Sequence, residues 1–260
     1  MSKLQRLKTY RKERQRRYAP MKLHAEDVIR ILDAPLDLSW RRRFRHLSAE
    51  EQDEIVTNPA THFWPRKGLI AQQATTHELI RALDLATTTQ NRAIVCEILG
   101  WGRSPTAILA LVKCINDRSP RVRYEAVDAI GNIAMRLRHF RKGSTLSDII
   151  DPVTGETLLR QFVKEQAWKK PNNLLPSVLG AIGYLPAIPV LIHALERDDR
   201  WIRRFAAWSL QILDAREACP PLVKALDNET FDDVALVMRQ ALVGLGCMDG
   251  DSLQGGEQKP

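Results

Sequence analysis

Hydrophobic positions recur along the chain in a unit of about 31 residues, a period typical of helical repeats. The clearest copy begins at Leu111, and the same apolar pattern restarts at Leu191 and Leu222. In each copy a short segment carries apolar residues at spacings i, i+1 and i+4, which indicates a single stripe on a helix. A polar turn and a second, alanine-rich segment follow, so the pattern predicts two helices in each unit.

One such unit cannot bury its apolar stripe alone, so neighbouring units must stack. We expect about five units between residues 75 and 246, interrupted by an insertion at 135–154. Gly100, Gly131 and Gly183 stand where a left-handed residue would end a helix. The expected fold is all-α, a right-handed α-α superhelix.

The two ends of the chain lack this pattern. Residues 18–74 predict a helical cap on the first unit, with a short helix at 25–32. Pro59, Pro65 and Gly68 predict a break between this region and the repeats. Residues 247–260 are polar and glycine-rich, and we expect a flexible tail there.

The second helix of the best copy resembles the HEAT-repeat consensus at Asp117, Val122, Arg123 and Ala126, followed by Ile130 and Gly131. The short unit is similar to the HEAT-like repeats first associated with phycobilin lyases, and the segment 204–208 resembles an aromatic-alanine segment of those lyases. The resemblance covers roughly two-thirds of the chain and implies a HEAT-like solenoid. Repeats of this kind serve unrelated tasks, so the resemblance implies little about function.

The net charge of +8 is concentrated at the N-terminus. Residues 1–17 contain a single acid, Glu13, and form a basic arm that suits an acidic partner, either a protein or a nucleic acid. The arm carries Lys3, Arg6, Lys8, Arg11, Lys12, Arg14, Arg16 and Arg17. The rest of the chain is nearly neutral.

Arginines at equivalent repeat positions form the principal candidate surface. Arg92, Arg123 and Arg203 should form a row, which either pairs with turn acids such as Asp84, Asp117 and Asp198 or contacts a ligand. Trp201 starts a helix beside arginines and is a candidate anchor, because Trp and Arg dominate protein interfaces. The candidate binding set is Arg92, Arg118, Arg121, Arg123, Arg200, Trp201, Arg203 and Arg204.

The predicted insertion is also basic. It contains Arg136, Arg138, Arg141 and Lys142 with no acid before Asp148. A basic loop of this kind either contacts a partner or is simply solvated.

The sequence offers no pattern of catalytic or metal-binding residues. The histidines lack metal-ligand spacing, and HExxH, P-loop and GxSxG motifs are absent. A single His77-Glu78 pair is too few for the iron site of deoxyhypusine hydroxylase, an enzyme family on this fold. We expect no cofactor, no catalytic residue and no metal.

The four cysteines are scattered along the chain, and this pattern favours reduced, buried cysteines that act as small apolar residues in a reducing compartment.

No apolar run is long enough to cross a bilayer, and no apolar segment follows the basic arm, so we expect a cytoplasmic protein. The alternative is that the acid-free residues 1–12 are part of an organelle transit peptide. Three functions remain open. The first is a non-catalytic adaptor or scaffold that binds another protein or protein complex through its solenoid surface. The second is a nucleic-acid or ribonucleoprotein binder, and the third is a bilin lyase-like enzyme implied by the resemblance alone.

Overall fold

The computed structural model describes residues 22–34, 63–140, 150–165 and 172–249. Within these ranges the regular structure is helical, apart from one isolated bridge between Leu23 and Ala74. The prediction of an all-α fold is confirmed. The chain divides into two compact units, residues 1–98 and 99–260, which we describe separately.

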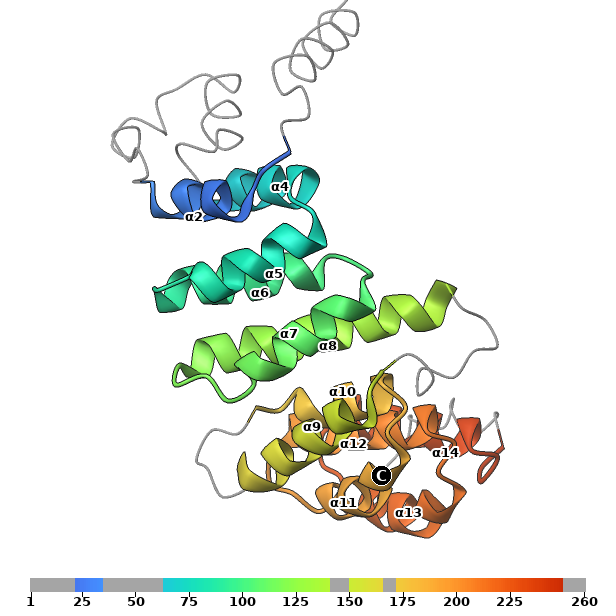
Figure 1. Ribbon diagram of the computed structural model, residues 1–260. Coiled ribbons are helices and arrows are strands. Elements are labelled where there is room, and N and C mark those ends of the chain that lie inside the picture. Colours follow the sequence, from blue (N-terminus) through green and yellow to red (C-terminus); the bar gives the residue numbers. More distant parts are fainter. Residues whose placement is uncertain (1–21, 35–62, 141–149, 166–171, 250–260) are drawn as a thin grey trace, which may run out of the picture. The chain divides into compact units, whose positions relative to one another are not determined.

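The first unit contains helices α2 (Ala25–Asp33), α4 (Phe63–Gln73), α5 (Thr76–Leu85) and α6 (Thr89–Gly100), the last of which ends just beyond it (Figure 1). Helix α2 packs against α5. The Ala25 N–H donates a 2.9 Å hydrogen bond to Glu78 Oε2, and Arg81 pairs with Glu26 at 2.9 Å. Polar contacts therefore fix the start of α2 on α5.

Helix α4 runs through Pro65 and Gly68, so the prediction of a break at these two residues is wrong. Pro65 lies in the first turn, where backbone N–H groups have no intrahelical acceptor and a proline removes no hydrogen bond. Gly68 lies inside the helix, where glycine costs only about 1 kcal/mol relative to alanine. Pro59 lies outside the described residues.

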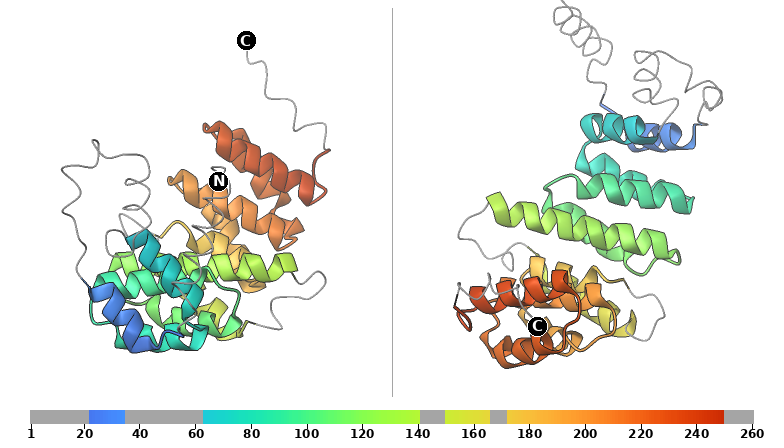
Figure 2. Two further views of the ribbon diagram at one scale, coloured as in Figure 1. Left: turned by 90° about the horizontal axis from the view of Figure 1, so that it is seen from above. Right: turned by 180° about the vertical axis from the view of Figure 1, so that it is seen from behind.

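The second unit is a series of helix pairs, visible from two further directions in Figure 2. Its helices are α7 (Pro105–Cys114), α8 (Pro120–Phe140), α9 (Pro152–Glu165), α10 (Leu175–Ala181), α11 (Ile188–Ala194), α12 (Arg200–Ile212), α13 (Cys219–Asp227) and α14 (Asp232–Gly244). Short 3₁₀ turns, η4 (Leu185–Ala187) and η5 (Arg216–Ala218), lead into α11 and α13. The second helices of successive pairs form one layer, since α8 packs on α10, α10 on α12 and α12 on α14.

Aliphatic and alanine side chains form the core between these helices. Helix α12 buries Ile202, Ala206 and Leu210 at helical spacing. Helix α14 repeats this stripe 32 residues later with Val234, Met238 and Leu242. Each fully buried large aliphatic side chain stabilises the fold by roughly 1.5–3 kcal/mol, which makes the stripe the main source of stability.

The glycines have different roles from those predicted. Gly183 does end a helix in the left-handed region, with φ of +76°. Gly131 instead lies within α8, so its assignment as a helix-ending residue is wrong. Gly100 is the last residue of α6, as predicted, but its φ is not in the left-handed region. At Gly100 the requirement is space, because a Cβ there would lie 2.7 Å from the Cα of Ala129 on α8.

The predicted insertion at 135–154 has different boundaries in the structure. Helix α8 continues to Phe140, and α9 already begins at Pro152. The extension of α8 was missed because its basic residues suggested a solvated loop, although Leu137 is buried and Arg136 and Arg138 are half-buried. Residues 141–149 lie outside the described ranges.

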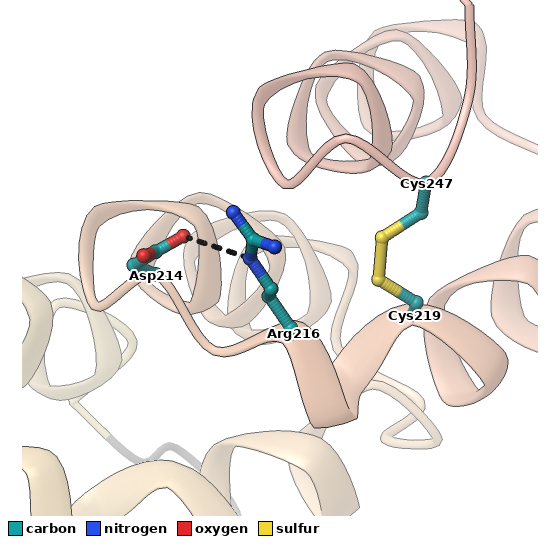
Figure 3. Close-up of a disulfide and its surroundings, with 4 residues drawn as sticks. All are labelled: Asp214, Arg216, Cys219 and Cys247. Atoms are coloured by element: carbon teal, nitrogen blue, oxygen red, sulfur yellow. Dashed lines mark ion pairs between the residues drawn. A yellow bond between two sulfur atoms is a disulfide. The ribbon is translucent and has the colours of Figure 1, made fainter.

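Cys219 and Cys247 form a disulfide, drawn in Figure 3, with a Cα–Cα distance of 6.1 Å and a sequence separation of 28 residues. The expectation that all four cysteines are reduced apolar residues is therefore wrong for this pair. Helix α13 starts at Cys219, and α14 returns the chain so that Cys247 comes beside it. Cys96 is buried in α6, and Cys114 is half-buried at the end of α7.

Two glycine-to-alanine substitutions should have opposite effects on stability. Gly100→Ala should lower the free energy of unfolding by about 1–3 kcal/mol, because the new Cβ overlaps Ala129. Gly68→Ala meets no described atom within 4 Å and should raise it by about 0.5–1 kcal/mol, since alanine favours the helix. Urea unfolding followed by circular dichroism measures both. Equal effects of the two variants would contradict the close approach of Gly100 to Ala129.

Candidate protein-binding surface

Arg203 is held between the turn of its own repeat and the next repeat. Its Nη1 donates to the backbone carbonyl oxygens of Arg197 and Asp198, at 2.6 and 2.8 Å. Its Nε and Nη2 donate to the Glu229 carboxylate at 2.7 and 2.8 Å. The Glu229 side chain is only 1% exposed. The hydrogen bonds between the two side chains raise the pKa of Arg203 and hold the pKa of Glu229 below its ordinary value of 4.5.

Arg123 repeats this arrangement two helix pairs earlier. It donates to the carbonyl oxygens of Asp117 and Arg118 at 3.0 and 3.3 Å. Its Nε lies 3.7 Å from Glu165, a residue of the following helix pair whose side chain is 2% exposed. A neighbouring amide, Gln161 Nε2, also donates to Glu165 at 2.6 Å. The geometry favours the structural interpretation of Arg123 and Arg203, with glutamates of the next repeat as partners.

Arg92 makes the corresponding contact with the turn of its own repeat. Its Nη1 donates to the Thr87 carbonyl oxygen at 3.0 Å. Arg118 and Arg121 differ, because both side chains are exposed at the start of α8.

Arg136 and Arg138 lie on helix α8, so the expectation that they belong to a projecting basic loop is wrong. Arg136 donates to the carbonyl oxygen of Gly100, the last residue of α6, and Arg138 donates to that of Ala181, the last residue of α10, at 3.0 Å. The final carbonyls of a helix have no intrahelical donor, and these arginines supply one. Burial lowers the pKa of Arg138.

The start of α12 carries an exposed cluster of arginine and aromatic side chains. Asp199 caps the helix, since its Oδ1 accepts from the Trp201 and Ile202 N–H groups at 2.8 and 3.2 Å. The arginine–aromatic cluster consists of Arg200, Trp201, Arg204, Phe205 and Phe231. The Trp201 and Phe205 rings stack with centroids 6.2 Å apart.

Both arginines of this cluster lie over aromatic rings. The Arg200 guanidinium is 4.8 Å from the Trp201 ring centroid and 5.1 Å from that of Phe231, and Arg204 is 5.4 Å from Trp201. Such cation–π contacts stabilise an exposed site by about 0.5–1 kcal/mol each and hold the guanidinium planes in place. The rings remain accessible, with Trp201 36% and Phe231 42% exposed.

Asp233 neutralises this cluster only weakly. It lies 3.9 Å from Arg200 and 3.4 Å from Arg204, and all three side chains are at least 35% exposed. Ion pairs this open contribute at most about 1 kcal/mol. The guanidinium hydrogens can therefore exchange this carboxylate for one on a partner.

A groove with a volume of about 860 Å³ adjoins the cluster. Helices α11 and α13 form its walls, and Phe231 belongs both to the groove and to the cluster. Its lining comprises Pro189, Ile192, His193, Leu195, Glu196, Arg197, Asp198, Arg203, Pro220, Pro221, Lys224, Ala225, Asn228, Glu229, Thr230 and Phe231. The lining mixes proline and aliphatic side chains with charged and polar ones, so the groove offers both apolar contacts and hydrogen-bonding groups.

No group of three or more His, Cys, Asp and Glu side chains that could hold a metal occurs in the part of the chain that the structure describes. Within the same part, no helix is both long and apolar enough to cross a membrane. The basic arm, Arg141 and Lys142 lie outside the described residues, so their roles stay predictions.

Paired helices, short polar turns and interior arginines together define a HEAT-like repeat protein. A family model described as HEAT repeats matches residues 156–243, and one described as HEAT repeat matches residues 108–137. The chain is also similar to the phycocyanobilin lyase subunit alpha of Nostoc sp. strain PCC 7120, with 40% identity over 65 residues. The similar stretch covers 25% of this chain and 24% of that subunit.

The sequence predicts Arg200, Trp201 and Arg204 as binding residues but does not indicate which side chains surround them. Phe231 and Asp233 come from the following repeat, where Phe231 occupies the N-cap position that Asp199 holds in α12. Aligning helix starts between repeats would have indicated this juxtaposition.

The ion pair between repeats predicts a specific dependence of stability on pH. Glu229→Gln should lower the free energy of unfolding by about 1–2 kcal/mol at neutral pH, because the amide keeps an acceptor but loses the charge. The folded state depresses the Glu229 pKa, so the carboxylate stabilises above pH 4.5 and this contribution is lost as the pH falls through the folded pKa. The difference in free energy of unfolding between wild type and Glu229→Gln should therefore become smaller at acidic pH.

Urea unfolding at neutral pH and near pH 3 measures this difference. Glu217→Gln is a matched control, because Glu217 is exposed and the substitution removes the same charge. A similar loss in both variants, or a difference that widens in acid, would contradict the assignment.

Proposed function

We propose that this chain is a non-catalytic scaffold that binds another protein through the arginine–aromatic cluster at the starts of α12 and α14. The single observation that carries the proposal is the exposure of Trp201 and Phe231 with Arg200 between their rings. Trp, aromatic and Arg side chains dominate the energetics of protein interfaces. The adjoining groove would accept apolar side chains of the partner.

Several other arginines have structural roles, and this difference supports the assignment of Arg200 and Arg204 to a binding surface. Arg123 and Arg203 bind turn carbonyls and glutamates, and Arg136 and Arg138 bind the ends of neighbouring helices. Removing any of them would disturb the fold. Arg200 and Arg204, in contrast, contact aromatic rings and one exposed carboxylate, so a partner can engage them without unfolding a repeat.

The partner we propose carries carboxylates for the cluster and an acidic surface for the basic arm, residues 1–17. Planar guanidinium groups bind carboxylates in bidentate geometry, and stacking on rings pre-orients them. A nucleic acid is the alternative acidic partner, and it would offer phosphates in place of carboxylates. Nuclease treatment distinguishes the two kinds of partner.

A second candidate function rests on the similarity to the phycocyanobilin lyase subunit alpha. Under this alternative the chain would assist the attachment or removal of a bilin. Incubation of the purified chain with phycocyanobilin and an acceptor protein, followed by absorption spectroscopy of the acceptor, tests it. Covalent bilin transfer would overturn the non-catalytic assignment.

The principal test compares partner capture by variants of the tagged full chain. Trp201→Ala and the double variant Arg200→Ala, Arg204→Ala should each weaken binding by about tenfold or more, because they remove the stacked centre of the surface. Arg160→Ala is the matched control, since Arg160 is exposed on α9 and pairs with Glu156 one turn away. Quantitative mass spectrometry of the captured proteins, with and without nuclease, measures the effect.

The proposal requires that the same protein be retained by wild type and Arg160→Ala, lost from both cluster variants and unaffected by nuclease. Thermal unfolding must show that all variants remain folded. Equal retention by every variant would refute the assignment of the cluster. Loss on nuclease treatment would favour the nucleic-acid alternative.

A further inference from the structure

Helix α13 is weakly anchored compared with its neighbour. Among its residues only Leu222 is buried, whereas α14 buries Val234, Ala235, Met238, Ala241 and Leu242. Its ion pair to the turn after α11, Lys224 with Glu196 at 2.7 Å, is well exposed on both sides and contributes little. In the described part of the chain, the disulfide is therefore the strongest single attachment of α13.

The disulfide links α13, which has few buried residues, to the end of α14, which has many. Cys219 is the first residue of α13, and Cys247 follows the end of α14 (Figure 3). The position of Cys247 is fixed, because its N–H donates to the Leu242 carbonyl oxygen at 2.8 Å and Gly246 turns the chain with φ of +72°. The disulfide is thus anchored, at Cys247, to the well-packed end of α14.

Reductants can reach this bond. Cys247 is exposed and Cys219 is half-buried. Thiol–disulfide exchange requires access of an attacking thiolate to one of the sulfurs, which an exposed cysteine provides.

The same helix shapes the groove. Pro220, Pro221, Lys224 and Ala225 of α13 line one wall, opposite residues of α11. The turn after α13 leads to Phe231, which covers Arg200. The position of α13 consequently sets both the width of the groove and the placement of one ring of the cluster.

We propose that the Cys219–Cys247 disulfide is a redox-sensitive link between α13 and the end of α14, which we call the clasp. Its reduction by a dithiol frees α13 from the end of α14, and the groove then loses one wall. In the reaction, a thiolate of the dithiol attacks one sulfur and forms a mixed disulfide, and its second thiol then closes a new disulfide within the reductant. The protein gains two electrons and two protons as Cys219 and Cys247 become thiols, and the dithiol loses the same number. A disulfide oxidant reverses the step. The clasp is independent of what the surface binds.

Hydrogen–deuterium exchange of the wild-type full chain tests the clasp without any substitution. Dithiothreitol is the probe, and a gain of two hydrogens in intact mass confirms reduction of the disulfide. Amides between residues 222 and 231 should then exchange roughly tenfold faster or more, because local opening no longer works against a covalent bond. Amides of α14 should stay unchanged, and oxidised glutathione should restore the original rates.

Variants separate the clasp from other effects of reductant. Cys219→Ser with Cys247→Ser should behave like the reduced chain whether or not dithiothreitol is present, and Cys114→Ser should respond like wild type. Unchanged exchange at 222–231 after full reduction would overturn the proposal. So would equal loosening of α14, or a disulfide that dithiothreitol leaves intact in the folded protein.

Discussion

The last carbonyl groups of each helix have no intrahelical hydrogen-bond donor, so a fold made of many short helices needs other donors at every helix end. Short helices create many such ends, and in the second unit arginines supply the donors. Arg123 and Arg203 bind the carbonyls of the turns before their own helices, and Arg136 and Arg138 bind the last carbonyls of α6 and α10. Because Arg203 also reaches Glu229, one side chain satisfies a turn and links two repeats.

The arginines fall into two groups, those that bind backbone carbonyls and those that stack on aromatic rings. Those bound to carbonyls are part of the framework, and their positive charge is largely used within the protein. Arg200 and Arg204 lie at the start of α12, where the helix itself needs acceptors rather than donors, and Asp199 supplies these. Their guanidinium groups stack on rings at the surface instead. The HEAT-like framework thereby exposes the arginine–aromatic cluster, which is the binding surface that we propose.

The sequence alone predicted the helical repeats well, because the apolar stripe that stabilises each helix is written directly in residues such as Ile202, Ala206 and Leu210. The sequence named Trp201 as a candidate anchor for another local reason, its position at a helix start beside arginines. It could not predict Glu229 as the partner of Arg203 or Cys247 as that of Cys219, because these depend on how one repeat returns beside another. Basic residues of α8 were misread as a loop because their acceptors lie on other helices.

Site-specific photocrosslinking tests the central claim most directly. A benzophenone amino acid placed at residue 231, in the cluster, is compared with one at residue 163, an exposed position of α9 where Val163 is 51% accessible. We predict that exposure of native lysate to light yields a single protein adduct from residue 231 and none of that mass from residue 163. An identical adduct from both positions, or none from residue 231, would contradict binding through the arginine–aromatic cluster.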